Sequence, residues 1–251
     1  FDKDEGLHIL VRALGGQYLP LKNGTPTDCN PLQLDDTVPD NLEFMRHWLR
    51  RLVMRSPHDP LTVRQEDDLE QALRGTLELA RPFRRLSRLA AFLDITDPEG
   101  VHARLRKWCA SERGDYAWVF DNDRDEVASL LARHALIGFD VTDFLDNETV
   151  RAPLTMYLFH LVHHMVDGRP LVCWMDEFAK LLSDPAFAQF AKNGLETWRK
   201  KNANIATFTQ STSHVLGSSI ARTIVEQTPT KILFPNPDAD YDEYTRGFNL
   251  T

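Results

Sequence analysis

Two adjacent carboxylates, Asp176 and Glu177, directly follow the apolar run LVCWM at residues 171–175. This run has the length and composition of a buried strand. Ligands of open parallel sheets bind beyond the carboxyl ends of the strands, which is where both carboxylates would lie. In P-loop nucleoside triphosphatases, one such carboxylate supports Mg²⁺ and the other orients or deprotonates the attacking water. A helix cap by Asp176 would explain the same residues equally well.

A second polar side chain follows the next predicted strand. The segment NANIATFTQS, residues 202–211, predicts a strand at 205–209 with Gln210 at its tip. Glutamine both donates and accepts hydrogen bonds without titrating, so it can sense a γ-phosphate or hold a water. One strand-helix unit separates Gln210 from Asp176 and Glu177, which favours a shared site over the helix-cap interpretation.

A basic group, Arg199-Lys200-Lys201, precedes that strand at the end of a predicted helix. The helix dipole favours cations at such a position without any catalytic role. Alternatively, Arg199 could reach the phosphate site of a neighbouring subunit as an arginine finger. Its planar guanidinium suits phosphate oxygens better than the lysine ammonium groups do.

The scaffold that would position these side chains is predicted to be α/β, with a doubly wound, mainly parallel sheet. Strands alternate with amphipathic helices along most of the chain, which is typical of this class. We predict extended structure at residues 1–4 and 17–34, strands within 134–145 and at 171–175, 205–209 and 231–234, and helices at 7–14, 152–166, 185–201 and 213–223.

Residues 38–113 interrupt this alternation and predict helices only. Apolar residues recur there at helical spacing, and prolines separate the stretches. The segment also carries a basic cluster, which could form a docking surface or, more simply, a solvated helix face. The cluster consists of Arg81, Arg84, Arg85, Arg88, Arg104, Arg106 and Lys107.

Composition excludes several classes of protein. The 251 residues are 42% hydrophobic and carry a formal net charge of −8, which is typical of a globular protein rather than a generally cationic nucleic-acid binder. Cys29, Cys109 and Cys173 are widely spaced, so we expect neither a disulfide framework nor a zinc knuckle. No apolar run approaches the roughly 18 residues of a membrane-spanning helix.

The stretch from Leu171 to Thr251, together with FDKDEG…VRALGGQYLPLKNGTPTDCNPLQL near the N-terminus, resembles the TrbE/CagE (VirB-four) ATPases of type IV secretion and conjugation machines. The resemblance spans nearly the whole chain and is most specific from Asp176 to Pro237. It implies a RecA-like ATPase domain formed by residues 1–37 and 114–251, with residues 38–113 as an all-helical insertion. It further implies that the chain is a C-terminal fragment of such an ATPase.

The resemblance assigns roles to the polar residues at the predicted sheet edge. Asp176 is implied to support the metal and Glu177 to activate the water, as in a Walker B motif, with Gln210 as the sensor. Arg199, and less securely Arg222, would act on a neighbouring subunit. ATP and Mg²⁺ are the implied cofactors.

Three further residues are implied to lie near the nucleotide. Asp2 and Asp4 would follow the strand that reaches the nucleotide pocket, and Asn236 of the PNPD sequence at 235–238 would line the base or the subunit boundary.

The resemblance also implies partners and a location. The full-length protein is expected to form a hexamer at the cytoplasmic face of a bacterial inner membrane. It would contact other secretion-system ATPases and inner-membrane components, and its substrate would be nucleic acid or protein.

One departure affects all of these expectations. The sequence GxxxxGK[ST], whose backbone and lysine bind phosphates in this class, does not occur in the 251 residues. We expect this loop upstream of Phe1. A ring-forming DNA translocase and a non-catalytic scaffold subunit therefore remain as alternative functions.

Overall fold

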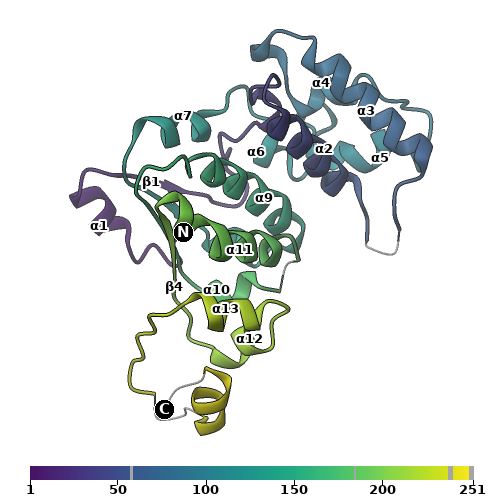
Figure 1. Cartoon of the computed structure of the whole chain (residues 1–251). Helices are drawn as coiled ribbons and strands as arrows, with labels where there is room; N and C mark the ends of the chain where they lie inside the picture. The colour runs from purple at the N-terminus through teal and green to yellow at the C-terminus, as the bar shows by residue number, and fades with distance from the viewer. Residues whose placement is uncertain (57–58, 184, 237–239, 249–251) are drawn as a thin grey trace.

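The computed structural model describes residues 1–56, 59–183, 185–236 and 240–248. Helices and parallel strands alternate along it, except for a long helical segment after the first strand (Figure 1). The strands are β1 Gln17–Pro20, β2 Ile137–Asp140, β3 Leu171–Met175 and β4 Ala203–Thr207. The α-helices are α1 His8–Ala13, α2 Pro39–Val53, α3 Val63–Leu77, α4 Leu86–Ala90, α5 Val101–Leu105, α6 Ala117–Phe120, α7 Glu126–Arg133, α8 Thr142–Leu145, α9 Glu148–His164, α10 Phe178–Leu181, α11 Pro185–Thr197, α12 Thr212–Leu216 and α13 Ala221–Gln227. Short 3₁₀ turns lie at Pro31–Gln33, Arg81–Phe83, Arg106–Trp108, Ala110–Glu112 and Trp198–Lys201, and a π-helical turn at Glu243–Gly247.

The first two residues join two parallel strand pairs into one sheet. β1 pairs with β2, and β3 pairs with β4. The Asp2 nitrogen donates to the Phe139 oxygen at 2.8 Å, and the Val141 nitrogen donates to the Asp2 oxygen at 2.9 Å. On the other side, the Phe1 nitrogen donates to the Trp174 oxygen at 2.7 Å, and the Asp176 nitrogen donates to the Phe1 oxygen at 3.1 Å. The hydrogen-bonded order is therefore β1, β2, Phe1–Asp2, β3, β4, all parallel.

Helices cover both faces of this sheet, but unequally. Phe1 packs edge-on against Phe159 of α9, and Gly194 of α11 lies directly against Ile205 of β4, so α9 and α11 cover one face. Val11 of α1 lies against Gly138 on the opposite face. Farther along that second face, Val172, Trp174 and Phe208 are exposed by 47%, 51% and 46%.

Among the described residues between β1 and β2, the regular elements are all helices, joined by turns and irregular stretches, and one isolated bridge links Ser56 and Asp59. Trp48 and Leu49 of α2 are fully buried, and α2 packs against α3, α5 and α9. Thr62 caps the start of α3 with a capping box. Its hydroxyl accepts a hydrogen bond from the Gln65 backbone nitrogen, and the Gln65 side-chain oxygen accepts one from the Thr62 backbone nitrogen. The helical segment and the sheet layer thus share one continuous hydrophobic core.

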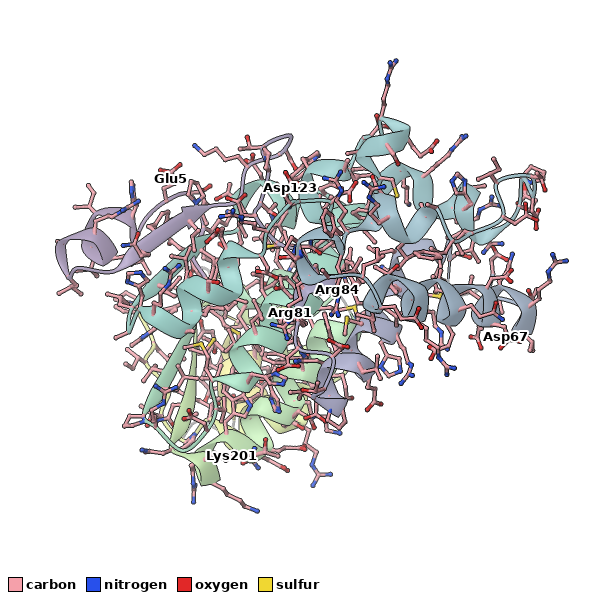
Figure 2. The ribbon with its side chains drawn as sticks, turned by 90° about the horizontal axis from the view of Figure 1, so that it is seen from above. Glu5, Asp67, Arg81, Arg84, Asp123 and Lys201 are labelled. Carbon is pink, nitrogen blue, oxygen red and sulfur yellow. The ribbon has the colours of Figure 1, made fainter. Side chains whose placement is uncertain are left out.

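The basic cluster in this segment is neither an open docking surface nor a wholly solvated face. Arg84 is buried and pairs with Asp36 at 2.8 Å, while Arg81 pairs with Asp35 at 3.4 Å and Arg85 pairs with Asp123. In the view of Figure 2, Asp67 and Lys201 lie at the periphery and Arg81 and Arg84 project over the middle, where Arg84 is buried and Arg81 remains exposed. Nearby aspartates therefore neutralise much of the cluster.

Most predicted elements agree with the structure, although α9 begins at Glu148 rather than at residue 152 and the segment predicted as extended at 17–34 contains the 3₁₀ turn Pro31–Gln33. The larger disagreements lie after β3. β3 matches its predicted bounds, whereas β4 begins and ends two residues earlier than expected. The predicted helix at 213–223 is divided into α12 and α13. The predicted strand at 231–234 is wrong, because this segment is irregular, pairs with none of the described strands, and leaves Ile232 and Phe234 largely exposed.

Two further observations concern the cysteines and the helices. All three cysteines are buried and free. Among the helices that the structure describes, none combines the length and the apolar character needed to cross a bilayer.

Candidate catalytic site at the sheet edge

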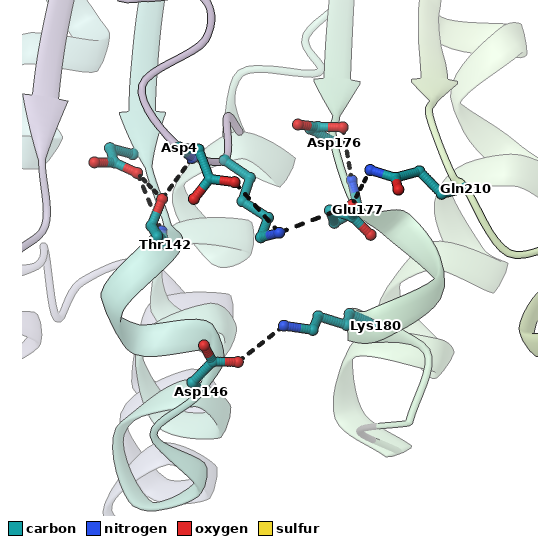
Figure 3. A network of polar contacts seen from close by, with 9 residues as sticks. Asp4, Thr142, Asp146, Asp176, Glu177, Lys180 and Gln210 are labelled. Carbon is teal, nitrogen blue, oxygen red and sulfur yellow. Dashed lines mark hydrogen bonds and ion pairs between the residues drawn. The ribbon is translucent and has the colours of Figure 1, made fainter.

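The ends of β3 and β4 are held together by backbone hydrogen bonds that continue past the strands. The Phe208 nitrogen donates to the Met175 oxygen at 2.9 Å, and the Phe178 nitrogen donates to the Phe208 oxygen at 3.0 Å. The residues that follow each strand consequently meet at one edge of the sheet (Figure 3). This is the edge at which parallel sheets bind ligands.

Glu177 and Gln210 meet at this edge. The Gln210 Nε2 atom donates a hydrogen bond of 2.8 Å to the Glu177 Oε1 atom. The side chain of Glu177 is only 16% exposed. Its backbone adopts the left-handed conformation, with φ 49° and ψ 36°, which costs a non-glycine residue roughly 1–2 kcal/mol. Such strain often accompanies a functional constraint, and here it accompanies a carboxylate held by a neighbouring strand.

Asp176 lies beside Glu177 and is half-buried. Its Oδ1 atom accepts a hydrogen bond of 2.9 Å from the Glu177 nitrogen. The helix-cap interpretation of Asp176 is wrong, because α10 begins after Glu177 and has no side-chain cap. Asp176 therefore has no local structural role as a cap and remains a candidate metal ligand.

The residues at this edge fit Mg²⁺ in one particular way. Throughout the described residues, no three His, Cys, Asp or Glu side chains converge to form a metal cage. Mg²⁺ commonly binds through one or two carboxylates, with water and substrate phosphates supplying the other oxygens. Asp176 fits that arrangement as a single protein ligand.

Lys3 also belongs to this edge, and the sequence reasoning missed it. Its Nζ atom lies 3.9 Å from Glu177 Oε1 and 3.4 Å from Asp4 Oδ2. The hydrogen bond that Lys3 donates to Asp4, followed by the negative charge of Asp4, raises the pKa of Lys3. The sequence shows a lysine between two aspartates at the end of a predicted strand, which could have indicated a role for Lys3. Its partner Glu177 is far away in sequence, so the ion pair itself was not predictable.

Asp4 is fixed at the same edge through the residues that follow β2. The Asp4 nitrogen donates to the Thr142 Oγ1 atom at 2.6 Å, and this hydroxyl donates to Asp140 Oδ1 at 2.6 Å (Figure 3). Asp4 and Glu5 both have left-handed backbones, with φ 59° and 53°. Asp4 and Glu177, two separately predicted site residues, thus lie at the same edge with Lys3 between them.

Asp2 does not join this cluster. It is buried, and its Oδ2 atom accepts hydrogen bonds from the Tyr18 hydroxyl at 2.6 Å and the Leu7 nitrogen at 2.8 Å. Burial and the bond to Asp2 raise the pKa of Tyr18 well above its ordinary value. The contacts of Asp2 hold the first residues of the chain to β1 and α1.

The remaining predicted residues lie apart from Glu177. Arg199 is exposed in the 3₁₀ turn that precedes β4, whereas Gln210 follows β4, so roughly 15 Å of strand separates the two ends. Arg222 is exposed on α13 and pairs with Glu226 at 2.7 Å. Asn236 is exposed in the irregular segment at 231–236. Pro237 and Asp238 lie outside the described residues.

The whole chain aligns with proteins of type IV secretion systems. It is 43% identical over 251 residues to the type IV secretion system protein virB4 of Bartonella henselae, and 40% identical over 260 residues to virB4 of Brucella suis. It is 41% identical over 257 residues to the type IV secretion system protein PtlC of Bordetella pertussis. In each comparison the alignment covers all of this chain and 31% of the relative, so the chain spans about a third of their length.

A solved structure shows the same fold. The structure of VirB4 of Thermoanaerobacter pseudethanolicus matches with a TM-score of 0.70 at 19% identity, covering all of this chain and 72% of the other. No family model matches the chain.

Proposed function

We propose that the chain is part of an ATP-hydrolysing motor that powers a type IV secretion system. The whole chain aligns with about a third of the length of virB4 proteins from such systems. The observation that carries this proposal is the hydrogen bond between Gln210 and Glu177 beside Asp176 at the sheet edge. The motor would drive secretion or conjugative transfer.

The chemistry follows from the three side chains at this edge. Glu177 would accept a proton from the water that attacks the γ-phosphate. Gln210 would fix the orientation of that carboxylate, since its amide already donates to Oε1. Asp176 would hold Mg²⁺, which when bound neutralises phosphate charge. Asp4 and Asn236 remain proposed contacts of the nucleotide, whereas the contacts of Asp2 within the fold argue against including it.

Phosphate binding would come from a segment outside these 251 residues. The chain contains no GxxxxGK[ST] sequence and spans 31% of its virB4 relatives. The exposed Val172, Trp174 and Phe208 side chains support this proposal, because such a segment could cover the open part of the sheet.

The larger assembly is also a proposal. Residues 1–37 and 114–251 would form a RecA-like domain, and residues 38–113 an all-helical insertion. Arg199 lies at the opposite end of β4 from Gln210, which supports the proposal that it acts on the nucleotide of a neighbouring subunit in a hexameric ring. Arg222 is the weaker candidate because Glu226 already pairs with it. The ring would lie at the cytoplasmic face of the inner membrane, with other secretion components as its partners.

ATP hydrolysis by the purified full-length gene product tests the proposal. We expect Mg²⁺-dependent release of phosphate, and we expect Glu177→Gln to abolish turnover while preserving ATP binding. Near-normal turnover by Glu177→Gln would exclude the proposed base. Hydrolysis that requires added DNA would instead favour a DNA translocase, and ATP binding without any hydrolysis would favour a scaffold subunit.

A further inference from the structure

Among the described residues, Lys3 is the cation that forms an ion pair with Glu177. Its side chain is 25% exposed and spans the gap between the Asp4 carboxylate and Glu177 Oε1. Gln210, which follows the neighbouring strand β4, donates a hydrogen bond of 2.8 Å to the same Oε1 atom. One oxygen of Glu177 therefore has a neutral donor from β4 on one side and a charged donor from the N-terminal segment on the other.

The backbone that carries Lys3 is fixed on both sides of the residue. Before it, Asp2 is hydrogen-bonded into the sheet through Phe139 and Val141. After it, the Asp4 nitrogen donates to Thr142, which in turn donates to Asp140. Both neighbours of Lys3 are therefore held against the end of β2. From this position the Lys3 side chain reaches Glu177, which follows β3.

We propose that Lys3 is a positioning residue for ATP hydrolysis, which holds the Glu177 carboxylate in the orientation needed to activate water. This inference rests on the proposed function. A single hydrogen bond from Gln210 leaves the carboxylate free to rotate about it, and the attraction of a nearby ammonium group restricts that freedom. The spacing of 3.9 Å is an ion-pair distance rather than a short hydrogen bond, so Lys3 restrains Glu177 without displacing Gln210.

Asp4 sets the position of the Lys3 ammonium. The 3.4 Å contact with Asp4 Oδ2 is shorter than the contact with Glu177. Asp4 is itself largely exposed, so its carboxylate acts as a tether on the solvent side of the lysine. Asp4 thus positions the Lys3 ammonium group, and Lys3 in turn restrains the Glu177 carboxylate.

Steady-state kinetics of the full-length gene product test this role. We expect Lys3→Met to lower kcat about 10-fold or more and to leave KM for ATP within about 3-fold, because the substitution affects the reacting water rather than nucleotide binding. Lys3→Arg retains a cation and should restore kcat to within about 3-fold. Lys22→Met is the matched control, since Lys22 pairs with Glu5 at 3.2 Å on the exposed side of the same region.

A double variant separates positioning from general structural damage. In the Gln210→Ala background, which retains measurable turnover but has lost the other restraint on Glu177 Oε1, Lys3→Met should lower kcat by a smaller factor than in the original protein, since both residues position the same carboxylate. Unchanged kcat in Lys3→Met, a raised KM with normal kcat, or additive losses in the double variant would each overturn the inference. These results would leave the proposed function intact, whereas full activity of Glu177→Gln would defeat the proposed base itself.

Discussion

Gln210 donates a hydrogen bond of 2.8 Å to Glu177 although 33 positions separate them in sequence. The bond connects the residues that follow two neighbouring parallel strands, so it depends on the register of β3 against β4, in which Met175 pairs with Thr207. A shift of either strand would separate the amide from the carboxylate. The sheet thereby fixes the relative position of two groups that neither loop could fix alone.

Replacing Gln210 by alanine should lower kcat for ATP hydrolysis by about 10- to 100-fold, which is less than the roughly 10²–10⁴-fold typical of a lost general base because Glu177 itself remains. The amide no longer restrains Glu177, while Asp176 keeps its contact with the Glu177 nitrogen. Steady-state phosphate release measures the change. Gln189→Ala, at an exposed position on α11, is the matched control and should retain the original rate. Equal rates in the two variants would exclude Gln210 from the site.

Replacing Asp176 by asparagine should raise the Mg²⁺ concentration for half-maximal hydrolysis by about 10-fold or more. Asparagine keeps an oxygen that can accept from the Glu177 nitrogen, so the local fold should persist. It loses the charge that a hard divalent cation prefers. A Mg²⁺ titration of the hydrolysis rate gives the result, with far-ultraviolet circular dichroism to confirm folding. An unchanged titration midpoint would mean that another residue binds the metal.

The sequence predicted the strand-end carboxylates well because their signal is local. An apolar run bounded by Asp176 identifies β3, and alternation with helices identifies a parallel sheet. Lys3 and Arg84 were missed as functional or structural residues because their partners, Glu177 and Asp36, are distant in sequence. A charge pattern shows which residues are basic, but only the fold shows which carboxylate each one meets.

The incorrect strand at 231–234 has a different cause. Its apolar residues satisfy a strand pattern, but a strand also needs a neighbour to share its hydrogen bonds. In the described residues β4 pairs with β3 only, and Ile232 and Phe234 remain exposed. Local hydrophobicity therefore predicted what the segment could form and not whether a partner lies beside it.

Arg84→Ala should reduce the free energy of unfolding by about 3 kcal/mol, the usual cost of breaking a buried ion pair. Arg84 pairs with Asp36 at 2.8 Å and also donates to the Leu77 and Leu79 carbonyl oxygens at 2.5 and 2.8 Å. Its removal leaves a carboxylate and two carbonyls without their donor. Urea unfolding monitored by tryptophan fluorescence measures the loss.

The control for Arg84 is Arg88→Ala, because Arg88 is exposed on α4. A surface substitution of this kind usually changes stability by less than about 0.5 kcal/mol. If both variants lost the same stability, the buried network around Arg84 would not be its cause.

His160 should make the protein less stable as the pH falls below neutrality. Burial, followed by the nearby His164 and His163, lowers the pKa of His160 to about 3. Its ring stacks on Phe44 at 4.0 Å and its Nε2 atom lies 2.7 Å from the Asn41 Oδ1 atom, an acceptor that the neutral ring satisfies with one N–H. The unfolded chain binds the proton near the ordinary value of about 6.5, so between pH 6.5 and 3 protons favour unfolding.

The expected loss from this one residue is about 2 kcal/mol between pH 7 and pH 5. His160→Gln removes the titrating group, so its free energy of unfolding should fall less than that of the original protein over the same interval, even if the variant is less stable at pH 7. Urea unfolding at both pH values measures the difference, and His214→Gln, at an exposed position, serves as the control. Because the acidic groups are common to all three proteins, an equal pH dependence in His160→Gln and the original protein would show that His160 titrates alike in the folded and unfolded states.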